Sequence, residues 1–223
     1  SVCRVGEDYY LITSTFEFFP GVPIFHSRDL VNWQQIGHVI HRREQIPEKL
    51  NIFAATLRYH AGTFYMITTN VSTRGTFYVT ATDPTGPWSD PNWLDDVEGI
   101  DPDLYFDDDG RAYVISSSFE LTEINLITGQ LIGDQRKVWN GTGGRYPEAP
   151  HIYKKDRFYY LLAAEGGTEE AHSVPIARSN SIWGPYIDTP ANPLLAHATV
   201  AGMGHPIQGV GHADLVNAHD GTW

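Results

Sequence analysis

The chain has 223 residues, of which 41% are hydrophobic, and it carries a formal net charge of −12. This length and apolar content suffice for one sizeable domain with a hydrophobic core. The acidic balance argues against nucleic acid and anionic membrane surfaces, which attract Lys and Arg. No apolar run approaches the roughly 18 residues of a membrane span. The single cysteine, Cys3, excludes an internal disulfide and a Cys-based metal site.

Five stretches along the chain share one pattern: an apolar run, a polar turn with Gly or Asp, and a second run, usually rich in aromatics. They are CRVGEDYYLIT, LRYHAGTFYMIT, LYFDDDGRAYVI, IYKKDRFYYLLA and LVNAHDGTW. Each is typical of a β-hairpin with a tight turn. The residues at matching places are Tyr9, Phe64, Ala112, Phe158 and Trp223, separated by 55, 48, 46 and 65 residues.

Further strand-like segments lie between these hairpins, and no long helical period is present. A unit of about four strands repeated at this spacing predicts the blades of an all-β propeller. Four blade starts and the beginning of a fifth are visible. A four-bladed propeller and a large β-sandwich are the competing architectures, and the internal similarity argues against the sandwich.

The innermost strand of each propeller blade lines the central channel, so residues where these strands begin converge on one axis. Counting 10 or 11 residues back from the matched positions reaches Phe53, Asp101, Glu148 and His212. We call this shared spacing the phase of a residue. Asp101 has this phase and Asp103 does not, which favours Asp101 as the functional aspartate. We expect Asp107 to Asp109 to form a solvated turn, because Asp and Gly suit tight turns.

Two carboxylates around an aromatic-lined pocket are the apparatus of glycoside hydrolysis. Glu148 has Pro147, Ala149 and Pro150 as neighbours, an apolar collar that would raise the pKa of a general acid. Asp101 would raise it further by its charge, or orient the acid. The alternatives for Glu148 are a carboxylate at the rim and a structural ion pair.

His212 is either a structural residue or a channel residue that binds a sugar hydroxyl, a water or a central cation such as calcium. No clustered metal motif is present, so we expect no catalytic metal. Phe16, in STFEFFPG, either forms a pocket wall for a sugar ring or packs in the core. The sequons at Asn70 and Asn140 favour secretion only slightly.

These residues resemble glycoside hydrolase family 43, in the branch of β-xylosidases and α-L-arabinofuranosidases. The segments that carry the resemblance span the chain: SVCRVGEDYYLITSTFEFFPGVPIFHSRDLVNW, GIDPDLYFDDDGRAY, YPEAPHIYKKDRFYYLLAAEGGT and GHADLV. The resemblance implies a five-bladed β-propeller, of which residues 1–223 form an incomplete catalytic domain of about four blades and the start of the fifth. It also implies inversion at the anomeric carbon and a C-terminal β-sandwich domain beyond Trp223.

Carried over residue by residue, the resemblance makes Glu148 the general acid and Asp101 the aspartate that tunes it. Phe16, Phe53, His212 and Glu165 become substrate-binding residues. Phe53 departs from the Trp-Ala-Pro of the family, since Phe-Ala-Ala stands here. Ser1 matches the serine of an Asp-Pro-Ser motif, so the general-base aspartate is expected upstream of the chain.

Three functions follow as alternatives. The first is an inverting exo-β-xylosidase acting on xylo-oligosaccharides from the non-reducing end, without a cofactor. The second is an α-L-arabinofuranosidase acting on arabinoxylan side chains. The third is a non-catalytic carbohydrate-binding propeller. We expect the 223 residues alone to have little activity, because inversion needs a base. Neither nucleic acid nor membrane is an expected partner, and the sequence does not indicate an oligomeric state.

Overall fold

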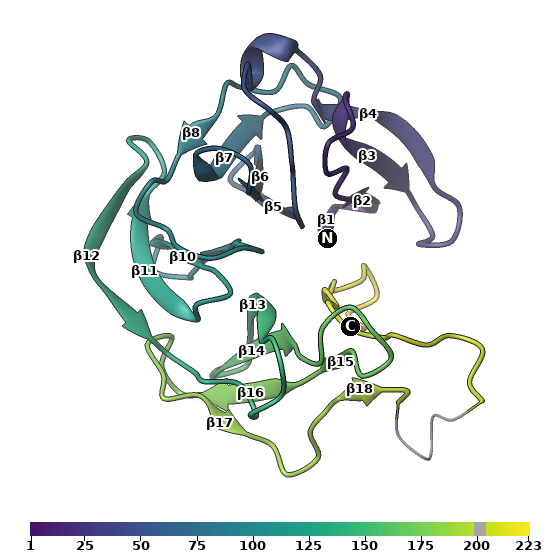
Figure 1. Cartoon of the computed structure of the whole chain (residues 1–223), viewed down its shortest axis with the longest axis vertical. Coiled ribbons are helices and arrows are strands. Elements are labelled where there is room, and N and C mark those ends of the chain that lie inside the picture. Colours follow the sequence, from purple (N-terminus) through teal and green to yellow (C-terminus); the bar gives the residue numbers. More distant parts are fainter. Residues whose placement is uncertain (199–203) are drawn as a thin grey trace.

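Four antiparallel sheets of four strands each surround a central axis in the computed structural model, which describes residues 1–198 and 204–223 (Figure 1). The first sheet contains β1 (Val2–Val5), β2 (Asp8–Ile12), β3 (Gly21–Ser27) and β4 (Gln34–Ile40). The second contains β5 (Thr56–His60), β6 (Thr63–Asn70), β7 (Gly75–Ala81) and β8 (Asn92–Trp93), after the short 3-10 helix η1 (Arg43–Gln45). Each sheet is one propeller blade, and its first strand lies nearest the axis.

The third blade contains β9 (Asp103–Phe106), β10 (Ala112–Ile115), β11 (Glu120–Asn125) and β12 (Gln130–Lys137). The fourth contains β13 (Glu148–Lys155), β14 (Phe158–Ala164), β16 (Ile176–Ser179) and β17 (Ile187–Asp188). A small pair beside it joins β15 (Ser173–Val174) to β18 (Leu195–Ala196). The prediction of an all-β propeller with four blade starts is therefore confirmed.

The first two strands of a blade are joined by tight turns. In blade 2 the closing pair is His60 with Thr63, and both turn residues, Ala61 and Gly62, have positive φ. Such turns match the right-handed twist of the flanking strands. Blades 1 and 4 also close with two-residue turns, between Val5 and Asp8 and between Lys155 and Phe158, in which only the first turn residue, Gly6 or Asp156, has positive φ.

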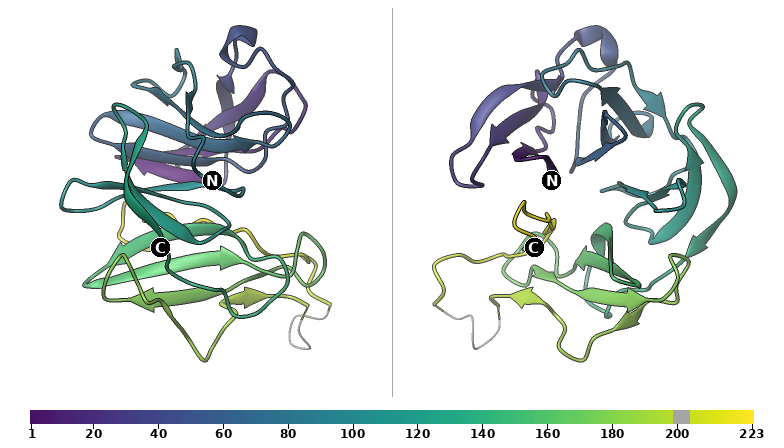
Figure 2. Two further views of the ribbon diagram at one scale, coloured as in Figure 1. Left: turned by 60° about the vertical axis from the view of Figure 1, so that its left-hand side comes forward. Right: turned by 180° about the vertical axis from the view of Figure 1, so that it is seen from behind.

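The apolar core lies between neighbouring blades, whose arrangement around the axis Figure 2 shows from two further directions. One buried cluster joins blades 1 and 2, including Ile12, Leu57 and Phe77. Two further clusters join blades 2 and 3 and blades 3 and 4. Packing face to face fixes the inner strands around the axis, which is where the candidate site lies.

The fifth hairpin expected at LVNAHDGTW does not form. The described residues 204–223 contain no strand, although a turn closes where the N–H of Ala218 donates to the carbonyl of Thr222 at 2.7 Å. A strand requires a ladder of backbone partners, and this segment is held mainly by side chains instead. It lies in the gap between blade 4 and blade 1, so both chain ends meet near the axis (Figure 1).

The expectation of a solvated turn is wrong for Asp107. Its carboxylate is buried and accepts hydrogen bonds from Lys154 Nζ at 2.8 Å and from the Tyr159 hydroxyl at 2.6 Å. It therefore ties blade 3 to blade 4, whereas Asp108 and Asp109 are exposed as expected. No helix in the described part of the chain is long and apolar enough to cross a membrane.

Candidate active site

Three of the residues selected by phase come together at one end of the inner strands. Asp101 lies just before β9, Glu148 is the first residue of β13, and His212 belongs to the final segment. One carboxylate oxygen of each acid and one ring nitrogen of the histidine all lie within 4.8 Å of one another. Residues more than 100 positions apart in the chain thus form one polar cluster.

The backbone is left-handed at each of these three places. Asp101 has φ 52°, His212 has φ 49°, and Ala149, which follows Glu148, has φ 51°. Non-glycine residues seldom adopt this conformation, and such strain concentrates at functional sites. In β13 it accompanies a break in register between Glu148 and His151, which sets the Glu148 side chain apart from the regular ladder.

Burial controls the charge of both carboxyl groups. Asp101 is only 5% exposed, and burial together with the nearby Glu148 raises its pKa to about 7. Burial also raises the pKa of Glu148, while His172 acts in the opposite direction. A carboxyl group that keeps its proton near neutral pH is what a general acid requires.

His212 faces this pair as a neutral imidazole. Its Nδ1 lies 3.9 Å from a carboxylate oxygen of Asp101, and its ring centroid lies 6.3 Å from that of His151. Burial and the neighbouring His151 lower its pKa to about 3. Calcium takes six to eight oxygen ligands, whereas this cluster offers two carboxylates and a ring nitrogen. The donor set fits acid–base chemistry better than a calcium site, and a cation or water beside His212 stays a prediction.

Glu165 holds a neighbouring loop. Glu165 is only 4% exposed. Its carboxylate accepts hydrogen bonds from the N–H of Thr142 at 2.7 Å, the hydroxyl of Thr142 at 2.5 Å and the N–H of Gly144 at 3.1 Å. A Cβ atom added at Gly141 or Gly144 would lie 2.3 Å from this carboxylate. The glycines of the GTGG segment thus let the loop wrap around Glu165, which is committed to this loop in the structure.

The aromatic residues expected to bind the sugar form a second group at the same end of the inner strands. Phe16 and Phe53 contact edge to face, with ring centroids 5.7 Å apart, and Phe16 pairs through its backbone with Ile52. Phe16 is 53% exposed, so its ring is available to a ligand. Phe18 instead lines a separate cavity of about 620 Å³ beside η1, which none of the three polar residues lines.

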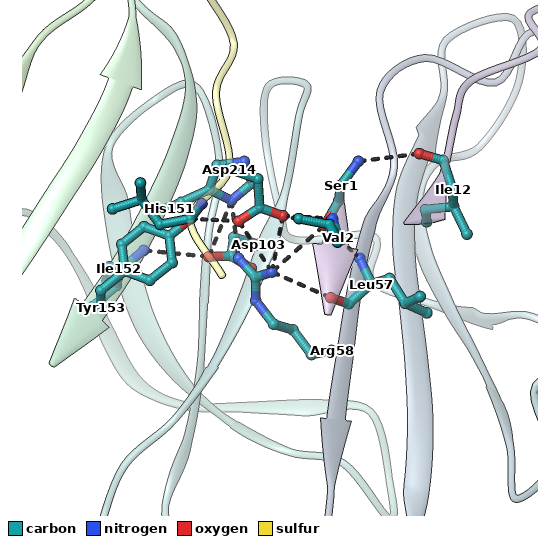
Figure 3. Close-up of polar contacts among 11 residues, drawn as sticks. Ser1, Val2, Ile12, Leu57, Arg58, Asp103, His151, Ile152, Tyr153 and Asp214 are labelled. Atoms are coloured by element: carbon teal, nitrogen blue, oxygen red, sulfur yellow. Dashed lines mark hydrogen bonds and ion pairs between the residues drawn. The ribbon is translucent and has the colours of Figure 1, made fainter. Parts of the chain in front are cut away.

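A second polar cluster, here called the polar belt, joins the inner strands around Arg58 (Figure 3). Arg58 on β5 forms ion pairs with Asp103 at 2.9 Å and Asp214 at 3.3 Å, and its Nη2 lies 3.1 Å from Nδ1 of His151. Asp214 also accepts hydrogen bonds from the Ser1 hydroxyl and the Tyr153 hydroxyl. Although burial alone would raise the pKa of Asp214, Arg58 holds it well below its usual range.

The sequence reasoning missed this belt, although a signal for it exists. Asp103 and Asp214 each stand two residues after a residue selected by its spacing, Asp101 and His212, and this closeness in the sequence is the signal. The contribution of Arg58 had no such signal, since blade 2 has an apolar residue, Phe53, at the matched position. His172, which lies 3.6 Å from Glu148, carried no sequence signal either.

Comparison with known proteins agrees with this fold. The family model described as glycosyl hydrolases family 43 matches residues 1–223. A non-reducing end alpha-L-arabinofuranosidase, BoGH43B from Bacteroides ovatus, is 48% identical over 236 aligned residues, which cover 100% of this chain and 44% of the relative. A beta-xylosidase from Bacillus subtilis is 38% identical, with 100% of this chain and 46% of the relative covered.

Among solved structures, that of "Bacteroides ovatus Xyloglucan PUL GH43B" matches with a TM-score of 0.93 and 47% identity. The match covers 100% of this chain and 46% of that one. The chain thus spans less than half the length of these relatives. Its four blades and final segment form part of a five-bladed β-propeller.

Proposed function

The chain belongs to glycosyl hydrolases family 43, and we propose that it forms most of the catalytic propeller of an inverting exo-glycosidase. The proposed substrate is a β-1,4-linked xylo-oligosaccharide, from which the enzyme removes xylose at the non-reducing end. Glu148 is the general acid and Asp101 is the residue that tunes it. Phe16, Phe53 and His212 are the proposed sugar-binding residues, and no cofactor takes part.

The observation that carries the proposal is the cluster of Glu148, Asp101 and His212 where the inner strands begin, and the distance between its two carboxyl groups shows that Asp101 is not the base. In inverting glycosidases the acid and the base stand about 6.5–9.5 Å apart, because a water molecule must fit between the base and the sugar. Asp101 and Glu148 approach within 4.8 Å, too close for that arrangement. Asp101 is also buried, with its pKa raised to about 7, which makes it a poor base at low pH.

The base must therefore come from elsewhere. Ser1 lies near the axis, where its hydroxyl donates to Asp214. A residue that precedes Ser1 in a longer chain would lie at the same end of the central channel as Glu148. We assign the base to an aspartate in this position, in the Asp-Pro-Ser sequence expected from the family resemblance.

In this mechanism Glu148 donates its proton to the glycosidic oxygen as the bond to the anomeric carbon breaks. The upstream aspartate removes a proton from a water that attacks the anomeric carbon from the opposite face, so the configuration inverts. The charge on Glu148 develops beside Asp101, and the repulsion is small wherever Asp101 still holds the proton that its raised pKa of about 7 allows. Phe16, with its exposed ring, supplies a stacking face for the sugar.

An α-L-arabinofuranosidase acting on arabinoxylan is the second candidate. It is favoured by the 48% identity to the Bacteroides ovatus arabinofuranosidase. The two candidates share the acid and the tuning residue, and they differ in the sugar that the pocket accepts. Turnover of aryl β-xylopyranoside and aryl α-L-arabinofuranoside, measured side by side, separates them. A β-sandwich domain following the propeller is part of the same proposal for the full-length protein.

The test removes the acidic proton of Glu148. In the full-length protein, Glu148→Gln should lower kcat on xylobiose by about 10²–10⁴-fold, the usual contribution of general acid catalysis. Glu169→Gln is the matched control, because the Glu169 side chain is exposed and forms an ion pair with Arg145 at the surface. Undiminished turnover by Glu148→Gln contradicts the assignment. Sugar binding by a wild-type protein that hydrolyses neither glycoside would favour a non-catalytic binding propeller.

A further inference from the structure

His172 directly precedes β15 and lies against Glu148. The residue is 6% exposed, and its buried Nε2 has no hydrogen-bond partner among residues 1–198 and 204–223. This nitrogen lies 3.6 Å from Oε1 of Glu148. Burying an unpaired polar atom is unfavourable, so an unpartnered nitrogen beside the proposed general acid requires an explanation.

Both the ring and the backbone of His172 are held in place. Gly211 lies directly on it, since a Cβ atom added there would be 2.2 Å from Cδ2 of His172. The backbone N–H of His172 donates to the carbonyl of Glu169 at 3.0 Å. The next residue, Ser173, pairs with Glu165 through two backbone hydrogen bonds of 2.9 and 3.1 Å.

This connection links His172 to the loop that Glu165 organises. Gly166 makes the turn possible, because a Cβ atom there would lie 2.1 Å from the carbonyl oxygen of Ala171. Glu165 follows Ala164, which pairs with Glu148 in the blade 4 sheet. The acid and the histidine are therefore carried by adjoining backbone segments, and their relative position is set by the fold.

We propose that His172 is a positioning residue for the general acid, a role that rests on the function proposed above. With a proton on Nε2, His172 donates to Oε1 of Glu148. The acidic proton of Glu148 is then restricted to Oε2, the oxygen left to face the leaving group. After proton transfer the same N–H stabilises the carboxylate. The distance of 3.6 Å shortens to a hydrogen bond when substrate binds, as catalytic contacts often do.

The other ionisable groups facing Glu148 do not offer this contact. Asp101, from the segment before β9, is a carboxyl group that repels the charged form of Glu148. His212, from the final segment, has its nearest ion-pair partner in Asp101 at 3.9 Å. Within the described residues, His172 is the neighbour whose effect lowers the pKa of Glu148.

The test compares leaving groups in the full-length protein. Xylobiose has a poor leaving group that needs proton donation, whereas 2,4-dinitrophenyl β-xyloside has a good one that does not. His172→Phe should lower kcat on xylobiose by about tenfold or more and leave the activated glycoside nearly unchanged. The alkaline limb of the pH profile should move to higher pH, because Glu148 loses the neighbour that lowers its pKa.

His172→Gln places an amide N–H near the position of Nε2 and should restore most of the rate on xylobiose. An equal loss on both substrates by both variants, or no loss on xylobiose by His172→Phe, would overturn the proposal. Should His172→Phe fold poorly, the leaving-group comparison on His172→Gln and His172→Asn decides, because Asn places its amide nearer Nδ1 and should not rescue. A wild-type protein that turns over neither xylosides nor arabinofuranosides would refute the proposed function instead.

Discussion

Asp101 and Asp103 are two residues apart and have different surroundings. Asp103 is fully buried between Arg58 and His151, so its charge is compensated. Asp101 has no such cation and lies against a second carboxyl group, and its pKa is raised to about 7. The sequence favoured Asp101 through its phase with Glu148 and His212. It did not indicate the role of Asp103, because ion pairing across blades depends on contacts between distant segments.

The raised pKa of Asp101 predicts a pH-dependent effect of Asp101→Asn on stability. A carboxyl group whose pKa is higher in the folded state stabilises the fold fully below its unfolded pKa of about 3.9. This contribution is lost as the pH rises through about 7. Relative to wild type, Asp101→Asn should therefore gain on the order of 2–4 kcal/mol in unfolding free energy between pH 4 and pH 8.

Urea unfolding of both proteins at the two pH values measures this difference. Asp109→Asn is the control, since Asp109 is exposed in a turn and should show little change. A difference between Asp101→Asn and wild type that is constant with pH would show that Asp101 titrates normally. Activity should fall in Asp101→Asn, because the tuning charge is removed from beside Glu148.

At the scale of elements, the hairpin pattern predicted four blades correctly because tight turns and alternation are local properties. The strands after each hairpin follow the same rule, and their order in the sheets is sequential in three blades. The fifth hairpin failed because its pattern is local but a strand needs a partner. Residues 204–223 instead place His212 and Asp214 at the axis through side-chain contacts.

The inner strands explain why a short phase rule located much of the candidate site. They begin at the same end of the channel, so matched positions converge whatever the sequence between them. The rule placed Asp101, Glu148 and His212 in one cluster. It could not find His172, which reaches Glu148 from a loop after β14, nor could it tell that Glu165 is occupied by loop hydrogen bonds.

The fold decides which of the two sequons is accessible for glycosylation. Asn70 is fully buried, and its amide donates to the carbonyl of Lys49 at 3.0 Å. A glycan cannot be accommodated there in the folded chain. Asn140 is exposed. The slight preference for secretion that the sequons gave therefore rests on Asn140 alone.

At the scale of the whole molecule, Arg58 joins the blades around the axis. It contacts Asp103 of blade 3, His151 of blade 4 and Asp214 of the final segment (Figure 3). Burial would lower the pKa of Arg58, but the two aspartates raise it well above its ordinary value, so it stays charged. Removing one member of a buried ion network leaves the others uncompensated, which is strongly destabilising.

Arg58→Met should therefore reduce the unfolding free energy by about 3–5 kcal/mol, since Asp103 and Asp214 would remain buried without their cation. Arg111→Met is the matched control, because Arg111 is half exposed and pairs with Asp109 at the surface. Its loss should stay below about 1 kcal/mol. Urea denaturation of the full-length variants measures both losses. Equal losses would contradict the role of Arg58 in joining the blades.

The central claim is that Glu148 and an aspartate upstream of Ser1 form a separated acid–base pair, with Asp101 as the tuning residue. The most direct test is to follow xylobiose hydrolysis by the full-length protein with proton NMR and to identify the anomer of xylose released first. The account predicts α-xylose, because water attacks from the face opposite the leaving group. Release of β-xylose would mean retention, and the close pair of Asp101 and Glu148 would then have to act as nucleophile and acid.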